Sequence, residues 1–185
     1  MTDPVHAYYS TVLTPTVPHC KAVDARAVEL AGGVADCLVL DMGCGVEAPP
    51  AAAAAARRWI ALDYSLPALR VRSDGSPRCL ADARQVPFRD AAFDVVVDFS
   101  AGDHWRDEGL RVIYAESTRV LRPGGRMIVT YAALEVFKVR ESPDYGRQVN
   151  RSAGEMAAML LAVGLKPVLS DPGNEGRALV IARKP

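Results

Sequence analysis

The chain has 185 residues, half of them hydrophobic, and its 22 basic and 22 acidic residues give a formal net charge of zero. This length suits a single domain that buries roughly 70% of the surface its unfolded form would expose, without disulfides or metals to stabilise it. The balanced charge argues against a nucleic-acid partner, and the sequence has no apolar run of the ~18 residues that a membrane span requires.

Four cysteines are spaced too irregularly for a familiar metal site or disulfide framework. Cys20, Cys37, Cys44 and Cys79 include no Cys-x-x-Cys pair, the spacing typical of zinc sites. Residues 1–4 are not followed by the apolar stretch of a secretion signal. We therefore expect a cytoplasmic protein with reduced thiols and no metal.

Strand-like apolar runs alternate with helical patterns from residue 34 to residue 130, which is typical of a parallel sheet joined by crossovers. The first strand is predicted at residues 37–40, where continuous apolar residues suit a strand buried on both faces. A run of alanines at residues 51–56 predicts a helix, because alanine is the best helix former. Pro49 and Pro50 fit its first turn.

The second strand is predicted to end at Asp63. Ser65 has the character of a cap, and a short helix is expected behind it over residues 68–72. Two further strands are predicted at residues 78–82 and 93–97.

A longer helix is predicted behind a cap at Asp107, because apolar residues recur at helical spacing as far as Leu121. The turn residues at 122–125 end this helix. A fifth strand is predicted at residues 127–131, and a less regular segment follows as far as Arg151.

The last part of the chain predicts a helix over residues 152–163 that is closed by Gly164. Two strands are expected at residues 165–169 and 178–182, with a hairpin turn at residues 171–174. With no internal repeat or linker, the pattern indicates one α/β domain.

The first strand leads into Gly43-Cys44-Gly45, and the acid Asp63 follows eighteen residues after Gly45. Glycines spaced by one residue allow a tight turn that brings backbone N–H groups against a ligand, as in dinucleotide sites. A pyrophosphate would however face Asp41 and Glu47, whose charges repel it. A ligand with an ammonium and a carboxylate fits better, and S-adenosylmethionine carries both.

At these residues the sequence resembles the class I S-adenosylmethionine-dependent methyltransferases, particularly the small bacterial group called type 11. Four blocks occur in the order of that family, at residues 39–45, 61–69, 81–96 and 119–127. The resemblance implies a single-domain, Rossmann-like sheet of seven strands, mostly parallel with an antiparallel terminal strand, and helices on both faces.

The resemblance also implies S-adenosylmethionine as cofactor and S-adenosylhomocysteine as product. It implies that Asp63 holds the ribose hydroxyls, that Asp82 accepts from the adenine amino group, and that Ala83 lines the ring. The family folds its N-terminal region over the cofactor, which makes Tyr8 a lid residue. The expected cofactor-binding residues are Tyr8, Asp41, Gly43, Cys44, Gly45, Asp63, Tyr64, Asp82, Ala83 and Ser100.

The same interpretation divides the domain into three parts. Residues 1–33 form an N-terminal lid or helical segment, residues 34–131 form the cofactor-binding core, and residues 132–185 form a substrate-side segment with a helix and a hairpin.

The methyl acceptor is expected beyond the fourth and fifth strands, between residues 100–105 and 131–135. His104 is the candidate general base, because its ordinary pKa near 6.5 allows proton exchange at neutral pH. Trp105 either stacks on the acceptor or packs in the core. Too few residues follow the fifth strand for a large cap, so we expect a small-molecule acceptor in a pocket that is small, open or completed in a homodimer.

Two alternative functions stay open. Glu47 stands near the place where many family members carry a third glycine; it either reorients the methionine end of the cofactor or faces solvent beside a helix N-terminus. The first case would suit a cofactor-binding but noncatalytic regulatory or scaffolding subunit. A nicotinamide-dependent oxidoreductase is the third hypothesis, and the acids around the glycines argue against it.

Overall fold

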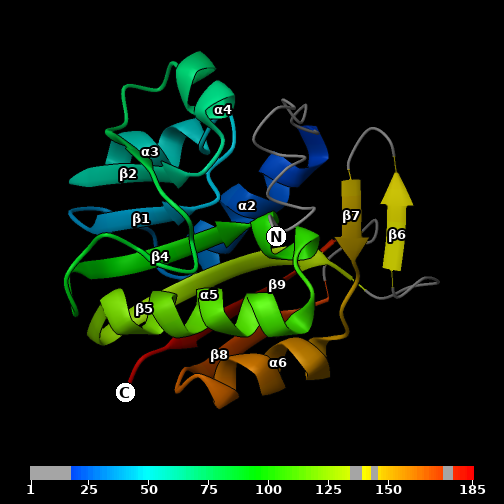
Figure 1. Ribbon diagram of the computed structural model, residues 1–185. Helices are drawn as coiled ribbons and strands as arrows, with labels where there is room; N and C mark the ends of the chain where they lie inside the picture. Colours follow the sequence, from blue (N-terminus) through cyan, green and yellow to red (C-terminus); the bar gives the residue numbers. More distant parts are fainter. Residues whose placement is uncertain (1–17, 134–138, 143–145, 173–176) are drawn as a thin grey trace.

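The computed structural model describes residues 18–133, 139–142, 146–172 and 177–185, and the predicted lid residue Tyr8 lies outside these ranges. Seven strands of the described chain form one sheet (Figure 1). In chain order they are β1 (Leu38–Met42), β2 (Arg58–Asp63), β3 (Arg78–Leu80), β4 (Phe93–Phe99), β5 (Leu121–Ala132), β8 (Lys166–Asp171) and β9 (Arg177–Arg183).

The sheet has the spatial order β3-β2-β1-β4-β5-β9-β8. β1 pairs in parallel with both β2 and β4, so that Val39 lies beside Trp59 on one side and Val95 on the other. β9 runs antiparallel between β5 and β8. This confirms the predicted sheet, which is mostly parallel with an antiparallel strand near its end.

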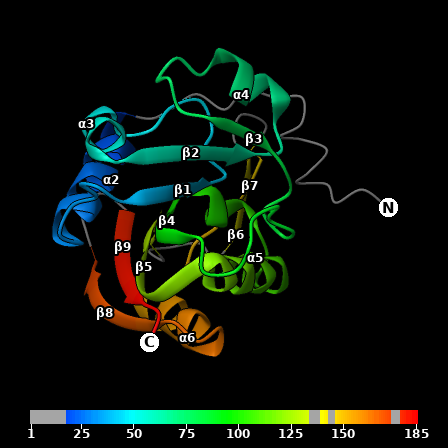
Figure 2. The ribbon, with the colours of Figure 1, turned by 90° about the vertical axis from the view of Figure 1, so that its left-hand side faces the viewer.

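Helices cover both faces of the sheet. Figure 1 shows α5 (Asp107–Val120) and α6 (Ala153–Ala162) in front of it and α2 (Pro18–Leu30) and α3 (Pro50–Ala55) behind it, and the side view of Figure 2 separates the two layers. The short helix α4 (Leu66–Val71) packs on β2 and β3.

Successive residues of each strand serve the two cores in turn, because side chains alternate across a sheet. In β1, Val39 joins the core under α2 and α3, while Leu40 joins the core under α5 and α6. Both side chains are fully buried. This explains why the parallel strands appear as continuous apolar runs in the sequence.

The predicted helix ends are largely confirmed. Ser65 caps α4 by accepting a hydrogen bond from the Ala68 N–H at 3.3 Å. Ser152 and Glu155 form a reciprocal capping box at the start of α6, and Gly164 follows that helix with a φ of 86°. A positive φ is the ordinary reason for glycine at this position.

Two predicted boundaries around α5 are wrong. Arg106 occupies the N-cap position, and Asp107 is the first helical residue, whose carboxylate accepts from Arg151 at 3.0 Å. At the other end β5 begins directly at Leu121 and includes residues 122–125. The strand extends this far because the chain end pairs with it, as in the bond from the Gly124 N–H to the Lys184 carbonyl at 2.9 Å.

The segment described from the sequence as less regular contains a small hairpin. β6 (Val139–Ser142) and β7 (Gly146–Val149) pair antiparallel, apart from the main sheet. Their sequences, Val-Arg-Glu-Ser and Gly-Arg-Gln-Val, have no apolar alternation, and that alternation is the signal by which half-buried strands are found.

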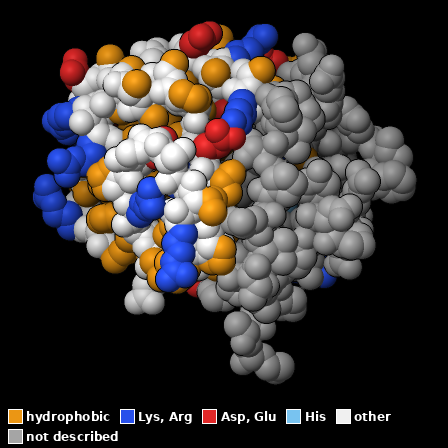
Figure 3. Space-filling view, turned by 90° about the horizontal axis from the view of Figure 1, so that it is seen from above, with side chains coloured by type: hydrophobic (Ala, Val, Ile, Leu, Met, Phe, Trp, Pro, Cys, Tyr) orange, Lys and Arg blue, Asp and Glu red, His pale blue; other side chains and the backbone are white. Residues whose placement is uncertain are grey.

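None of the described helices is long and apolar enough to cross a membrane. Figure 3 looks down on the α4 end of the molecule, where apolar side chains lie scattered among polar and charged ones. Exposed apolar side chains at this edge of the sheet include Leu66, Val71 and Leu80. Single exposed apolar residues are usual on protein surfaces.

Candidate functional site

The predicted site residues of the core lie at the carboxyl ends of neighbouring strands. Asp41 lies at the end of β1 and the turn 43–45 follows it, Asp63 ends β2, Asp82 follows β3 and Ser100 follows β4. The chain leaves β1 toward β2 and returns on its other side through β4, so the strand order reverses there. Ligands of open α/β sheets bind in the crevice at such a reversal.

The two glycines of the turn, Gly43 and Gly45, differ in the space around them. Gly43 and Gly45 both have positive φ, at 65° and 55°, which other residues adopt at a cost. A Cβ at Gly43 would collide with the Cβ of Ala101, whereas a Cβ at Gly45 would meet no atom of the described residues within 4 Å. Gly43 therefore permits close packing inside the protein, and the space above Gly45 is open.

Asp63 ties the end of β2 to this turn. Its carboxylate accepts from the Gly45 N–H at 2.9 Å and from the Ser65 N–H at 2.8 Å. Burial raises the pKa of Asp63, and the bonds from these backbone groups oppose that rise. A carboxylate can accept about four hydrogen bonds, and the backbone N–H groups of Gly45, Ser65 and Tyr64 take three of them, so Asp63 keeps capacity to accept from a ligand without releasing the turn. Tyr64 beside it is half-buried.

Asp41 has a cation of its own, which the sequence argument did not include. Its carboxylate accepts from Trp59 Nε1 at 2.9 Å and forms an ion pair of 3.3 Å with Arg72. Burial raises the pKa of Asp41 to about 6, against the opposing effects of Arg72 and Trp59. Its contact with a ligand ammonium stays a prediction, although its charge already has a partner inside the protein.

Glu47 forms an ion pair with Lys21 of α2. Both side chains are partly exposed. Glu47 thus has a cation partner in the N-terminal helix, an arrangement that neither alternative from the sequence included. Lys21 precedes the predicted core, and nothing in the local sequence marks it as a partner of the glycine turn.

Asp82 and the acceptor side are connected through Arg84. The Asp82 carboxylate accepts from Arg84 Nε at 3.0 Å and from its terminal nitrogen at 2.6 Å. The same guanidinium lies 5.0 Å from the centre of the Trp105 ring, at cation–π distance. Trp105 is 6% exposed and belongs to the core under α5, as one of the two sequence interpretations expected.

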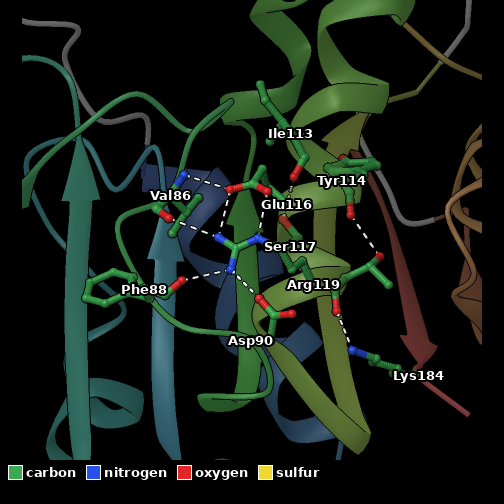
Figure 4. Close-up of polar contacts among 10 residues, drawn as sticks. Val86, Phe88, Asp90, Ile113, Tyr114, Glu116, Ser117, Arg119 and Lys184 are labelled. Carbon is green, nitrogen blue, oxygen red and sulfur yellow. Dashed lines mark hydrogen bonds and ion pairs between the residues drawn. The ribbon is translucent and has the colours of Figure 1, made fainter.

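The loop after Asp82 is fastened to α5, as Figure 4 shows. Arg119 donates to the carbonyls of Val86 and Phe88 at 3.0 and 2.8 Å, and Glu116 accepts from the Val86 N–H at 2.8 Å. Arg119 and Glu116 also form an ion pair of 2.8 Å. Arg119, the first residue of the fourth sequence block, thus holds the loop of the third block, together with Glu116 one helical turn earlier.

Ser100 begins the acceptor side, where β4 leads into the 3₁₀ helix η1 (Ala101–His104). Ser100 has a φ of 72° and bonds with Arg177. His104 ends η1 and is half-buried. The structure therefore places the candidate base at the end of a short element that follows β4.

Buried charged residues that sequence reasoning missed hold η1 in place. Asp98 accepts from the Gly102 N–H at 3.0 Å and from the Tyr114 hydroxyl at 3.0 Å. Arg151, which is 1% exposed, donates to the Gly102 and Trp105 carbonyls at 3.2 and 2.7 Å. The acid Asp98 interrupts the apolar run of β4, and this could have marked it in the sequence as a buried functional or structural residue. Nothing in the sequence around Arg151 marks that residue as buried.

Within the described ranges, no group of three or more His, Cys, Asp or Glu side chains is placed to hold a metal ion. The predicted wall residue Glu135 lies outside these ranges, as do residues 173 and 174 of the predicted terminal turn.

Comparison with known proteins shows that the sequence is similar to methyltransferases. A family model described as a methyltransferase domain matches residues 40–129. A malonyl-[acyl-carrier protein] O-methyltransferase of Hahella chejuensis is 37% identical over 93 residues, which are 47% of this chain and 33% of that protein. A probable S-adenosylmethionine-dependent methyltransferase of Mycolicibacterium smegmatis is 32% identical over 136 residues, which are 69% of this chain and 51% of that protein. The chain thus spans between a third and about half of these two relatives.

A solved structure shares the fold at low sequence identity. The 1,6-didemethyltoxoflavin-N1-methyltransferase of Burkholderia thailandensis, with bound 1,6-didemethyltoxoflavin and S-adenosylhomocysteine, superposes with a TM-score of 0.71 and 20% identity. The match covers 89% of this chain and 77% of that one.

Proposed function

The chain belongs to the class I S-adenosylmethionine-dependent methyltransferase family, and on this premise we propose that it transfers a methyl group from S-adenosylmethionine to a small-molecule acceptor. The observation that carries the proposal is the pairing of Asp63 with Gly45 at the strand-order reversal. It combines a buried acid that can accept further hydrogen bonds with open space over a glycine turn.

These residues fit the adenosyl part of the cofactor. A ribose presents two neighbouring hydroxyls, and the Asp63 carboxylate keeps acceptor capacity beyond its three backbone donors. The open space over Gly45 admits a ligand close to the backbone. Asp82 and Ala83 would serve the adenine, with the Asp82 carboxylate shared between the ligand and Arg84.

When bound, S-adenosylmethionine supplies a methyl group already activated by its positively charged sulfur. The protein's own contribution is then to hold cofactor and acceptor in line, an effect that reaches ~7–11 kcal/mol in favourable systems. The glycine turn at residues 43–45, the loop after Asp82 and η1 are each held by hydrogen bonds from arginine side chains, and they provide rigid supports for this orientation.

We assign the acceptor side to residues 100–105 and 131–133, with His104 as the general base when the acceptor must lose a proton. The neutral imidazole of a histidine takes up a proton near neutral pH. Asp103 supports this wall, because it accepts from the Ala132 N–H at 3.0 Å and pairs with Arg177 at 2.8 Å. This joins the end of β5 to η1.

A small-molecule acceptor is supported by the ligand of one structure with this fold and by the charge of the chain. The Burkholderia neighbour was solved with the small heterocycle 1,6-didemethyltoxoflavin. The zero formal charge of this chain provides no general attraction for a polyanion. We therefore also propose that the protein has no nucleic-acid partner.

The compartment and the oligomeric state belong to the same proposal. Cys37, Cys44 and Cys79 are free thiols in the structure, which agrees with a reducing cytoplasm. A homodimer that completes the acceptor pocket stays a prediction, and sedimentation of the purified protein would decide it.

Calorimetric titration of S-adenosylhomocysteine into the wild type and into Asp63→Ala tests the function. We expect the wild type to bind, and the variant to bind at least tenfold more weakly, because hydrogen bonds to a charged group contribute about 1.5–3 kcal/mol. Glu29→Ala, which removes an exposed acid from α2, is the matched control and should bind as the wild type does.

Failure of the wild type to bind either S-adenosylmethionine or S-adenosylhomocysteine would refute the cofactor assignment. Tight binding of NAD in their place would favour the oxidoreductase. Cofactor binding without methyl transfer to any of a broad panel of small acceptors would favour the noncatalytic subunit.

A further inference from the structure

Arg72 is a fully buried cation beside the glycine turn. It follows the last residue of α4, and its side chain has no exposed surface. One terminal nitrogen donates to the Cys44 carbonyl at 2.7 Å. The other lies 3.3 Å from the Asp41 carboxylate and 2.7 Å from that of Asp74. A guanidinium suits this place because its two terminal nitrogens reach separate acceptors in a fixed plane.

The Cys44 carbonyl and the Gly45 N–H are the two ends of one peptide group. Arg72 holds the carbonyl end, and Asp63 holds the N–H end at 2.9 Å. The next peptide group back is held as well, since the Cys44 N–H donates to the Leu62 carbonyl at 3.0 Å. Because Arg72 has no exposed surface, the Cys44 carbonyl is directed into the protein and away from the open space over Gly45.

The orientation of this peptide decides what the turn offers to a ligand. Gly45 adopts a φ of 55° and has space around its Cα, so its local sterics alone restrain the peptide weakly. Rotation of the peptide plane would turn the Gly45 N–H away from Asp63 and bring a carbonyl oxygen toward the ligand side. A buried charged group at each end opposes that rotation.

We propose that Arg72 is a positioning residue for the cofactor: its guanidinium fork locks the Cys44–Gly45 peptide and thereby keeps Asp63 and the turn in the binding arrangement. The inference rests on the proposed function for the identity of the ligand. Neutralisation of Asp41 is a second consequence of the same fork, and the experiment must separate the two effects.

The separating comparison is between Asp41→Asn and the double variant Asp41→Asn/Arg72→Met. The single variant keeps a side-chain oxygen for Trp59 and leaves Arg72 on Cys44, whereas the double variant removes both buried charges and the anchor. Arg72→Lys keeps the positive charge without the fork. Arg70→Met, on the exposed face of the same helix, is the control.

Two measurements are made on each protein: amide hydrogen exchange of Gly45 in the ligand-free state, and the Kd of S-adenosylhomocysteine by calorimetry. In the double variant we expect Gly45 to exchange at least tenfold faster than in Asp41→Asn, with unchanged exchange in β5 and α6. We expect its Kd to be at least tenfold higher. Arg70→Met should match the wild type in both measurements.

A folded double variant that matches Asp41→Asn in both measurements would overturn the proposal. If the double variant does not fold, Arg72→Lys decides: faster Gly45 exchange supports the fork, and wild-type exchange overturns it. If the wild type binds no S-adenosylhomocysteine, the proposed function fails, while the exchange comparison in ligand-free protein still tests the role of Arg72.

Discussion

Three buried aspartates are among the described residues whose ionisation this fold alters most. Asp24, Asp41 and Asp98 are at most 8% exposed. Burial raises their pKa values to about 6, about 6 and about 7, although hydrogen bonds from Thr130, Trp59 and Gly102 lower them in part. Since an unfolded aspartate ionises near pH 3.9, the folded protein holds these protons to a higher pH than the unfolded chain does.

The direction of the pH dependence follows from linkage. A group whose pKa is raised by folding stabilises the protein fully below its unfolded pKa, and that stability is lost as the pH rises through the folded pKa. We therefore expect the free energy of unfolding, measured with urea, to fall as the pH rises from about 4 to about 7 and to level off above that, where the three groups are ionised in both states. For Asp98 alone the whole loss is on the order of 4 kcal/mol.

The variant Asp98→Asn assigns this effect to one group. An asparagine can still accept from the Gly102 N–H and remain beside the Tyr114 hydroxyl, but it does not titrate. Its stability should depend less on pH over the same range than that of the wild type. Asp90→Asn changes a side chain that is 78% exposed and should keep the wild-type slope. An unchanged slope in Asp98→Asn would contradict the assignment.

Among the glycines whose surroundings the structure describes, Gly43 is the one whose replacement it tolerates least. An added methyl group would combine a positive φ with a collision against Ala101. We expect Gly43→Ala to lower the unfolding free energy by at least ~2 kcal/mol and to weaken S-adenosylhomocysteine binding.

Gly154→Ala is the matched control for this change. Gly154 lies in α6, has no positive φ, and a Cβ there would meet no atom within 4 Å. Alanine at a helical position should stabilise the protein by about 0.5–1 kcal/mol. Equal effects of the two substitutions in urea unfolding would show that the packing against Ala101 is unimportant.

At the scale of elements, α5 has two separate tasks. Its apolar side chains, such as Leu110 and Ile113, pack against the sheet. Glu116 and Arg119 instead hold the loop that follows Asp82 (Figure 4). The helix therefore connects the core with the loop on the adenine side of the proposed site.

Removal of one of these contacts should loosen the loop more than the helix. In Arg119→Met the carbonyls of Val86 and Phe88 lose their charged donor, and we expect faster hydrogen exchange over residues 84–90 with a loss of ~1–3 kcal/mol in stability. Arg111→Met, an exposed change on the same helix, should alter neither quantity. Wild-type exchange in the Arg119 variant would show that the loop needs no anchor on α5.

The hairpin and η1 illustrate the same dependence between elements. Arg151 follows β7 and bonds to the Gly102 and Trp105 carbonyls, while its backbone N–H donates to the Ala132 carbonyl at 3.0 Å. One residue thus connects the segment after β7 with η1 and the end of β5. Any acceptor bound in this region would meet walls that Arg151 helps to hold.

At the scale of the whole molecule, the strand order creates the site. The chain forms β1, β2 and β3 outward in one direction and then returns to place β4 and β5 on the other side of β1. Residues as far apart as Gly45, Asp63, Asp82 and Ser100 therefore end at one edge of the sheet. Parallel strands make this convergence unavoidable once the order is set.

Much of this architecture could be predicted from the sequence. The positions of α3, α4 and α6 and the buried strands follow from apolar runs, alanine content and caps such as Ser65 and Ser152. The hairpin of β6 and β7 was missed because its strands carry no apolar alternation. The cap at Asp107 was misplaced because an acid in the first turn of a helix serves either as a cap or as an ion-pair partner, and Arg151 decided between them.

The sequence by itself determined the α/β class, the family resemblance, the glycine turn and the acids at the strand ends, because these depend on local periodicity and spacing. Only the tertiary structure decided which cation each acid has: Arg72 for Asp41 and Lys21 for Glu47. It also decided that both ends of the Cys44–Gly45 peptide are held. Such partners are distant along the chain and meet only when the sheet is assembled, and for Asp41 and Arg72 burial strengthens the interaction beyond its value in water.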